Sequence, residues 1–172
     1  MQFVMEYGDT NFIGVVNPTE YRAFVDHNWE LDTLLQRFVD QMNQGNIIVL
    51  QMTNEGIEHS WKVEVQIGVE PREQECFRKA KGYIRVTDNQ LFLVDYDCLT
   101  MAAQFEDEQV PDKNCSSYKI GLDNGLYEVN FVQYYNVDAD EYYGSKEVDI
   151  SMYFIKVLDF PKNADKVIWC TF

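Results

Sequence analysis

Residues 117–135 read SYKIGLDNGLYEVNFVQYY, and this stretch sets the fold class that we expect. Apolar and polar side chains alternate on both sides of Asp123-Asn124-Gly125, a sequence typical of a tight turn between two strands. After the turn, Tyr127, Val129 and Phe131 fall on one face of an extended chain, because successive side chains of a strand point to opposite faces. We therefore predict a β-hairpin with one buried face.

Strand signals recur along most of the chain. Residues 61–67 alternate strictly, as in a half-buried antiparallel strand, whereas residues 46–52 form a short apolar run of the length of a buried strand. A second hairpin is predicted where residues 82–86 and 91–94 flank the turn Thr-Asp-Asn-Gln. The other predicted strands are residues 2–7, 12–16, 147–158 and 166–171.

One amphipathic helix is predicted at residues 30–44, where apolar side chains repeat at the spacing of a single helical face and Gly45 provides a C-terminal stop. The repeating side chains are Leu31, Leu34, Leu35, Phe38, Val39 and Met42. Weaker signals predict a short helix that starts after Asn17-Pro18, and one or two helical turns at residues 99–105.

The order of these elements indicates an α+β fold that is mainly antiparallel β. We expect about nine strands in a sandwich or a strongly bent sheet, with the amphipathic helix packed on it. With 172 residues and no linker or repeat, the chain is predicted to form a single domain, residues 1–172.

Charge is the most unusual property of the composition. The chain has 29 Asp and Glu against 14 Lys and Arg, for a net charge of −15. Direct binding to nucleic acid or to an anionic membrane is therefore not expected, because those partners require basic side chains. A basic protein partner is favoured instead.

The chain also lacks the sequence signals of export and membrane insertion. The first residues have no positive flank and carry Glu6 and Asp9, so no signal peptide is predicted. No apolar run approaches the ~20 residues of a membrane span. We expect a soluble protein of the cytoplasm.

No catalytic, cofactor or metal motif stands out. The four cysteines have no paired spacing and are expected to be reduced, mostly buried thiols, with neither zinc nor any cofactor bound. They are Cys76, Cys98, Cys115 and Cys170. His27 and His59 are expected to be surface side chains, so the chain is predicted not to be an enzyme.

Two weaker chemical alternatives remain open. Asp95 and Asp97 are spaced as a carboxylate pair that a small glycosidase could use. The loop that begins at Asp138 starts like a calcium-binding EF-hand, but Tyr142 and Tyr143 stand where an oxygen ligand and a glycine are needed. A different calcium site in this loop is left open, although none is expected.

The acidic residues are concentrated in two stretches. Residues 95–112 contain six acids and no Lys or Arg, and residues 123–149 contain seven acids and one Lys. Because the predicted hairpin lies between them, we expect the two stretches to form one acidic patch, with tyrosines as apolar anchors. The candidate partner-binding residues are Asp95, Asp97, Glu106, Asp107, Glu108, Asp138, Asp140, Glu141, Tyr142 and Tyr143.

These observations favour an acidic binding protein. The most specific hypothesis is a bacterial immunity-type inhibitor that neutralises a basic, nuclease-like toxin by covering its active site. The alternative is a β-sandwich module that binds a ligand or a protein in an accessory role without inhibiting it. A third class, a small hydrolase or a calcium-dependent protein, rests on the two weaker alternatives above.

Overall fold

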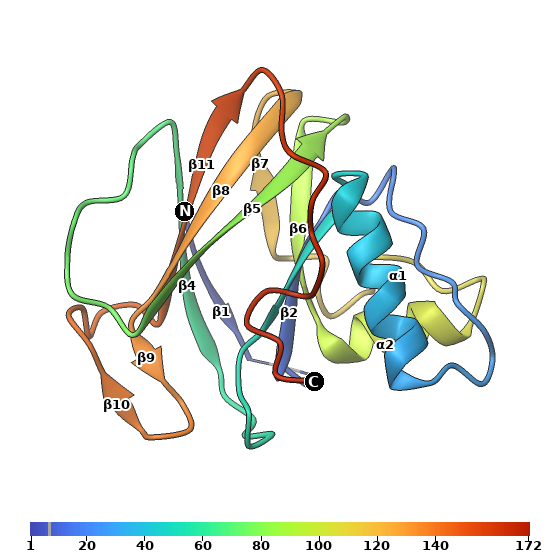
Figure 1. The fold of residues 1–172 in the computed structure, drawn as a ribbon, viewed down its shortest axis with the longest axis horizontal. Coiled ribbons are helices and arrows are strands. Elements are labelled where there is room, and N and C mark those ends of the chain that lie inside the picture. Colours follow the sequence, from blue (N-terminus) through green and yellow to red (C-terminus); the bar gives the residue numbers. More distant parts are fainter. Residues whose placement is uncertain (7) are drawn as a thin grey trace.

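Two β-sheets and a pair of helices form three layers in the computed structural model, which describes residues 1–6 and 8–172 (Figure 1). The five-stranded sheet lies on one side, the four-stranded sheet lies in the middle, and the helices cover the outer side of the four-stranded sheet. One hydrophobic core joins both sheets and both helices. The α+β, mainly antiparallel fold class is confirmed.

The five-stranded sheet carries the alternating sequences. Its order is β1 (Gln2–Met5), β4 (Trp61–Ile67), β11 (Ile150–Val157), β8 (Gly125–Gln133) and β5 (Arg78–Val86). In β4, Trp61, Val63 and Val65 are buried while Lys62 is exposed, so the predicted half-buried strand is confirmed. Its pairing is mixed, because β4 runs antiparallel to β1 but parallel to β11.

The four-stranded sheet carries the continuous apolar runs. Its order is β3 (Ile47–Gln51), β2 (Phe12–Val16), β6 (Gln90–Asp95) and β7 (Lys119–Gly121). Every residue of β2 and β3 is buried. A strand covered on both faces has no exposed side for polar residues, which explains why these segments do not alternate.

The two helices pack on the middle sheet. α1 (Leu31–Asn43) confirms the predicted amphipathic helix and contacts β3 with buried residues such as Phe38. α2 (Tyr96–Gln104) starts earlier than the sequence pattern suggested, because the Asp95 carboxylate caps it by accepting a hydrogen bond from the Cys98 amide at 2.8 Å. Within residues 1–6 and 8–172, neither helix is long and apolar enough to cross a membrane.

The short helix predicted after Asn17-Pro18 is wrong. The segment makes a single turn, in which the Tyr21 amide donates to the Asn17 carbonyl at 3.0 Å, and the amides that follow bond to other elements instead of continuing a helix. The Arg22 amide donates to Gln41 Oε1 at 2.9 Å, and the Val25 amide donates to the Ala103 carbonyl at 2.8 Å.

Both predicted hairpins are wrong. β5 and β8 belong to the five-stranded sheet, whereas their predicted partners β6 and β7 belong to the four-stranded sheet. The two turns therefore cross from one sheet to the other at the same end of the molecule. They are joined there by Asn89 and Asn124, because each amide donates to the other side chain, at 2.7 and 3.3 Å. Turn chemistry reverses the chain but does not select the sheet that receives it.

Two smaller predictions differ from the structure, and part of a third cannot be compared with it. Residues 166–171 form no strand; they meet β3 through one parallel bridge, Leu50 to Ile168, and through the Thr171 amide, which donates to Gln51 Oε1 at 3.0 Å. The expected acidic loop after Val137 instead lies within a small hairpin of β9 (Tyr135–Asn136) and β10 (Glu141–Tyr142). Tyr7, the last residue of the first predicted strand, lies outside the described residues.

The two sheets pack tightly against each other at Gly82 in β5. A Cβ atom on this residue would lie 2.9 Å from Ile48 Cγ2 in β3, a distance that a real side chain does not adopt. We predict that Gly82→Val lowers the free energy of unfolding by about 1–3 kcal/mol, because the sheets must move apart to admit the side chain. Urea denaturation measures the change.

The matched control is Gly121→Val. This glycine also lies in a strand, but a Cβ there would have no neighbour within 4 Å. Its unfolding midpoint should stay close to that of the unchanged chain. Equal losses in the two variants would show that the tight contact at Gly82 does not limit how the sheets pack.

Candidate functional site

The predicted partner-binding residues lie in two separate regions. Figure 1 shows the loop of the β9–β10 hairpin toward the edge of the molecule that carries the C-terminus, and Asp97 lies in the first turn of α2. The loop that follows α2 carries Glu106, Asp107 and Glu108 and lies at the opposite end, beyond the helices. The expectation of one acidic patch is therefore wrong, because the intervening turn crosses between sheets instead of closing a hairpin.

Asp95 is not a surface residue. Its side chain is only 1% exposed, and its carboxylate is occupied in capping α2. Burial raises the pKa of Asp95, since a buried carboxylate is harder to ionise. Asp95 therefore cannot contact a partner in this fold, nor can it form a solvent-accessible catalytic pair with the exposed Asp97.

A groove of about 370 Å³ lies at the end of the four-stranded sheet where β2 begins and β3 and β6 end. Asp9 and Glu55 line it as acidic groups, and the rings of Phe12, Tyr96 and Phe172 line it as apolar groups. The Phe12 and Tyr96 rings stack with their centroids 5.0 Å apart. The groove thus combines carboxylates with an aromatic surface, although neither Asp9 nor Glu55 was among the predicted site residues.

Hydrogen bonds connect this groove to two of the predicted acids. The Asp9 amide donates to Asp97 Oδ2 at 3.0 Å. On the other side, the Asp138 carboxylate accepts from the Thr53 hydroxyl, from the Asn54 amide at 3.0 Å and from the Glu55 amide at 3.3 Å. We use the name acidic edge for Asp9, Glu55, Asp97, Asp138, Asp140 and Glu141.

Asp138 fixes the loop that carries Glu55. Burial opposes its ionisation, but the hydrogen bonds from Thr53 and from the two amides outweigh burial and hold the pKa of Asp138 below its ordinary value. The carboxylate is therefore charged at neutral pH. It orders the loop at the rim of the groove and adds negative charge there.

The carboxylates of the acidic edge form no ion pairs with Lys or Arg among the described residues. In the described part of the chain, Lys81 is the only Lys or Arg that forms an ion pair with a carboxylate. Its Nζ atom lies 2.9 Å from Glu128 Oε1. Arg78 attracts Asp138 electrostatically but forms no ion pair with it, because its guanidinium stacks 4.1 Å from the Trp169 ring centroid and donates to Gln133 Oε1 at 2.8 Å. Apart from the attraction between Arg78 and Asp138, the negative charge of the acidic edge is therefore not paired with Lys or Arg among the described residues.

The β9–β10 hairpin is anchored by a buried carboxylate. Asp149 is fully buried and accepts from the Tyr142 hydroxyl at 2.8 Å, from the Lys62 amide at 2.9 Å and from His59 Nε2 at 2.9 Å. The Tyr135 hydroxyl also donates to Asp140 Oδ1 at 2.7 Å. The contact of Tyr142 with Asp149 and that of Tyr135 with Asp140 fix the hairpin that carries Asp140 and Glu141.

The tyrosines predicted as anchors are both half-buried. The Tyr142 ring packs against Tyr135, with centroids 4.6 Å apart, and its hydroxyl is used by Asp149. The Tyr143 ring stacks on Phe77 at 5.8 Å, and its hydroxyl donates to Glu141 at 2.8 Å. Tyr142 thus holds the hairpin in place, while Tyr143 flanks the acidic edge.

The pairing of His59 with Asp149 was missed in the sequence. The two residues are 90 positions apart, so no local spacing marks them. A carboxylate that orients an imidazole is also found in catalytic sites, where the imidazole acts on a nucleophile. Among the described residues, the ring forms a hydrogen bond only with Asp149 and otherwise packs against Trp61 and Tyr135. The arrangement fits a structural anchor.

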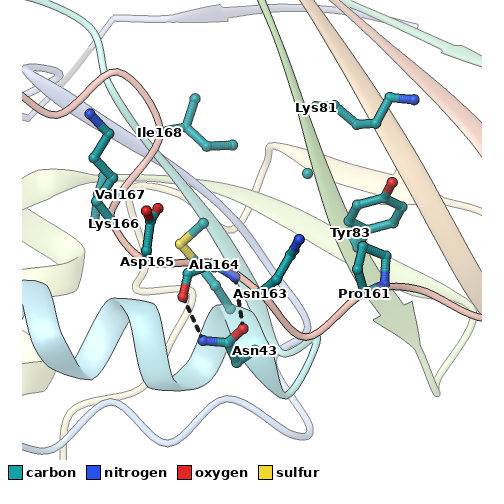
Figure 2. A pocket seen from close by; sticks show the side chains of 12 residues that line it. Asn43, Lys81, Tyr83, Pro161, Asn163, Ala164, Asp165, Lys166, Val167 and Ile168 are labelled. Carbon is teal, nitrogen blue, oxygen red and sulfur yellow. Dashed lines mark hydrogen bonds between the residues drawn. The ribbon is translucent and has the colours of Figure 1, made fainter.

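A second pocket lies between α1 and the C-terminal segment. Figure 2 shows Lys81 and Tyr83 on one side and residues 163–168 on the other, with Asn43 joined to the Ala164 backbone by two hydrogen bonds of 2.9 Å. Its volume is about 270 Å³. Pockets that enclose small-molecule ligands usually measure ~300–1,000 Å³, so this one is small for a substrate site.

The loop of the β9–β10 hairpin does not gather calcium ligands. In residues 1–6 and 8–172, the one group of three or more potential metal-binding atoms lies elsewhere, at Cys98, Asp112 and Cys115. The carboxylates of Asp138 and Asp140 are instead bonded to Thr53 and Tyr135. The calcium alternative therefore has no geometric support.

Comparison with known proteins identifies a related fold but no family. No family model matches the chain, and no curated protein is significantly similar to it. Among solved structures it is similar to ComJ from Bacillus subtilis, described as an inhibitor of the DNA-degrading activity of NucA. The TM-score is 0.50 at 10% identity, over 91% of this chain and 94% of that chain. At this identity, the similarity establishes a shared fold.

We predict that Asp149→Asn lowers the free energy of unfolding by about 2–3 kcal/mol at pH 7, because an amide cannot accept all three of the buried hydrogen bonds. Hydrogen bonds from His59, Lys62 and Tyr142 outweigh burial and hold the pKa of Asp149 below its ordinary value. Its stabilisation should therefore be complete above about pH 5 and should decline as the pH falls through the folded-state pKa.

Urea denaturation of both proteins at pH 7 and at pH 3 tests this expectation. The difference in stability between them should shrink at the lower pH. A difference that stays constant over this range would mean that the charge of Asp149 does not contribute.

Proposed function

We propose that this chain is an immunity-type inhibitor that binds a basic, nuclease-like protein through the acidic edge and covers its active site. The observation that carries the proposal is the set of carboxylates around an aromatic groove, none of which forms an ion pair with a Lys or Arg of the described residues. The fold shared with ComJ supports it, since that fold also serves a nuclease inhibitor.

The groove is suited to a basic side chain of the partner. A lysine or arginine inserted there would meet the carboxylates of Asp9 and Glu55 and would lie beside the Phe12 and Tyr96 rings. Charge-assisted hydrogen bonds and cation–π contacts would both contribute, and aromatic pockets of this kind are typical binding hot spots. Asp97 lies beside Asp9 and extends the negative surface.

The acidic edge is held in shape before any partner arrives. Asp138 fixes the Glu55 loop from one side, and Asp149 fixes the hairpin that carries Asp140 and Glu141. A preorganised surface loses less conformational entropy on binding, so more of its contact energy appears as affinity. This rigidity suits an inhibitor that must occupy one defined active site.

The proposed mechanism is occlusion of a phosphate-binding surface. A nuclease needs cationic groups where nucleic acid binds, and carboxylates placed there would compete with the phosphates. The proposed contact residues keep Asp97, Asp138, Asp140, Glu141, Tyr142 and Tyr143 and add Asp9 and Glu55. Glu106, Asp107 and Glu108 are left out because they lie at the other end of the molecule. The cytoplasm, where the four free cysteines would stay reduced, is the proposed location.

Inhibition is tested directly with two nucleases. The first is NucA, and the second is any basic nuclease encoded beside the gene of this chain. We expect degradation of linear double-stranded DNA to stop for at least one of them near one inhibitor per nuclease. A gel-shift control should show no binding of this chain to the DNA itself, which excludes protection by masking. Complete degradation by both enzymes at a large excess of this chain would contradict the proposal.

The position of the interface is tested by two variants with equal changes in charge. The edge variant is Glu55→Gln, Asp97→Asn and Glu141→Gln, whose amides keep the size of each side chain. The control variant is Glu106→Gln, Asp107→Asn and Glu108→Gln. At low salt, the edge variant should slow association with the inhibited nuclease by about tenfold or more, and the control by less than about twofold.

Surface plasmon resonance at two salt concentrations measures both effects. Association of the unchanged chain should slow steeply as salt rises, because screening weakens steering between charged surfaces. Equal effects of the two variants would show that net charge matters and the acidic edge does not. Binding that neither variant nor salt alters would favour the accessory-module alternative.

A further inference from the structure

Two buried thiols and a carboxylate converge where α2 meets the segment that follows it. Cys98 lies in α2, and Asp112 and Cys115 lie in the segment between α2 and β7. Their sulfur and oxygen atoms all lie within 4.8 Å of one another. Both cysteines are almost completely buried, whereas Asp112 is half-buried, so the cluster borders the surface on the side of Asp112.

The cluster is built from two copies of the same local arrangement. Asp95-Tyr96-Asp97-Cys98 and Asp112-Lys113-Asn114-Cys115 both place an aspartate three residues before a cysteine. In each copy the aspartate Oδ1 accepts the amide hydrogen of the cysteine at 2.8 Å. The two turns therefore hold their thiols in a similar way, and the fold brings these thiols together.

We propose that Cys98, Cys115 and Asp112 form a binding site for a zinc ion. Thiolates together with a carboxylate are ligands that zinc accepts, whereas calcium and magnesium prefer oxygen alone. Zn–S bonds of ~2.3 Å and Zn–O bonds of ~2.0–2.2 Å place ligand atoms of a tetrahedral site roughly 3.5–3.8 Å apart. The present spacing of up to 4.8 Å therefore closes with a shift of about 1 Å.

A water molecule that enters beside the half-buried Asp112 would complete the shell as the fourth ligand, because zinc sites with three protein ligands usually keep a water in that position. Asp95 is not available for this role, because its carboxylate caps α2.

Without a metal, the buried Cys115 thiol keeps its proton. The hydrogen bond between the two thiols and their burial both raise the pKa of Cys115. A bound zinc ion replaces these protons and deprotonates its thiol ligands. Zinc binding should therefore release protons and should tighten as the pH rises.

A zinc ion at this site would cross-link the segment between α2 and β7 to α2. The segment between α2 and β7 has no regular strand or helix and carries Glu106, Asp107 and Glu108. Because Cys98 lies in α2 and Cys115 lies near the end of the segment, a metal bound by both would hold that end against the helix. The site shares no residue with the acidic edge, although Cys98 directly follows Asp97 in α2, and it does not depend on the proposed inhibitor function.

The test uses the full chain, reduced and freed of metal, and zinc alone as the probe. Competition with a chromophoric chelator should give one zinc ion per chain, and added zinc should raise the melting temperature. Cobalt in place of zinc should produce the near-ultraviolet absorption of thiolate-to-cobalt charge transfer. Failure to retain zinc against the chelator, with no shift in melting, would overturn the proposal.

Variants assign the ligands. Asp112→Asn keeps an oxygen that can accept the Cys115 amide but removes the charged ligand, so the fold should persist while zinc affinity falls at least about tenfold. Cys98→Ser and Cys115→Ser should each remove the cobalt charge-transfer band or halve it. Cys170→Ser is the matched control, because this cysteine is also buried but lies outside the cluster.

Two outcomes would speak against the assignment. Equal loss of zinc in the Cys170→Ser control would show non-specific binding by thiols. Unchanged zinc affinity in Asp112→Asn and in both cluster cysteine variants would place the metal elsewhere. The melting temperature of each variant without zinc separates a loss of ligands from a loss of folding.

Discussion

Burial of the four-stranded sheet on both faces is the constraint on which the rest of the structure depends. The five-stranded sheet covers one face and the helices cover the other, so β2 and β3 contain almost no polar side chains. Charged groups are thereby confined to the outer face of the five-stranded sheet, to the helix surfaces and to the ends of the strands. The acidic edge lies at such ends, where residues that follow β3, β6 and β9 come together. The position of the candidate site thus follows from the layering.

Local patterns predicted the elements of the fold but not their partners. The alternation in Trp61–Ile67 and the apolar stripe of Leu31–Asn43 record how each segment meets the core, and both were read correctly. The sheet that a strand joins depends on contacts across the whole chain, so the turns at Asn89 and Asn124 were mistaken for hairpins. The helix expected after Asn17 does not form for a related reason. The amides of Arg22 and Val25 donate to acceptors in other elements of the fold.

The candidate site shows the same division. Composition correctly indicated an excess of carboxylates, but their order in the sequence did not indicate which ones share a surface. Asp95 precedes a helix, which is a position that favours a buried cap over a surface charge. Asp9 and Glu55 lie in unremarkable loops and reach the groove only through tertiary contacts. The pairs of His59 with Asp149 and of Cys98 with Cys115 likewise join residues that no local motif connects.

The parallel pairing of β4 with β11 has a consequence for how the chain folds during synthesis. β4 lies between β1 and β11, so it has only one of its two neighbouring strands until the ribosome has released residues 150–157. Until then, one hydrogen-bonding edge of β4 lacks its neighbour, and apolar side chains such as Trp61 and Val63 lack their final cover. Such nascent states are prone to aggregate and fold slowly, because their contacts join distant parts of the chain. Strong negative charge keeps such intermediates apart, and it therefore serves the unfinished chain as well as the finished one.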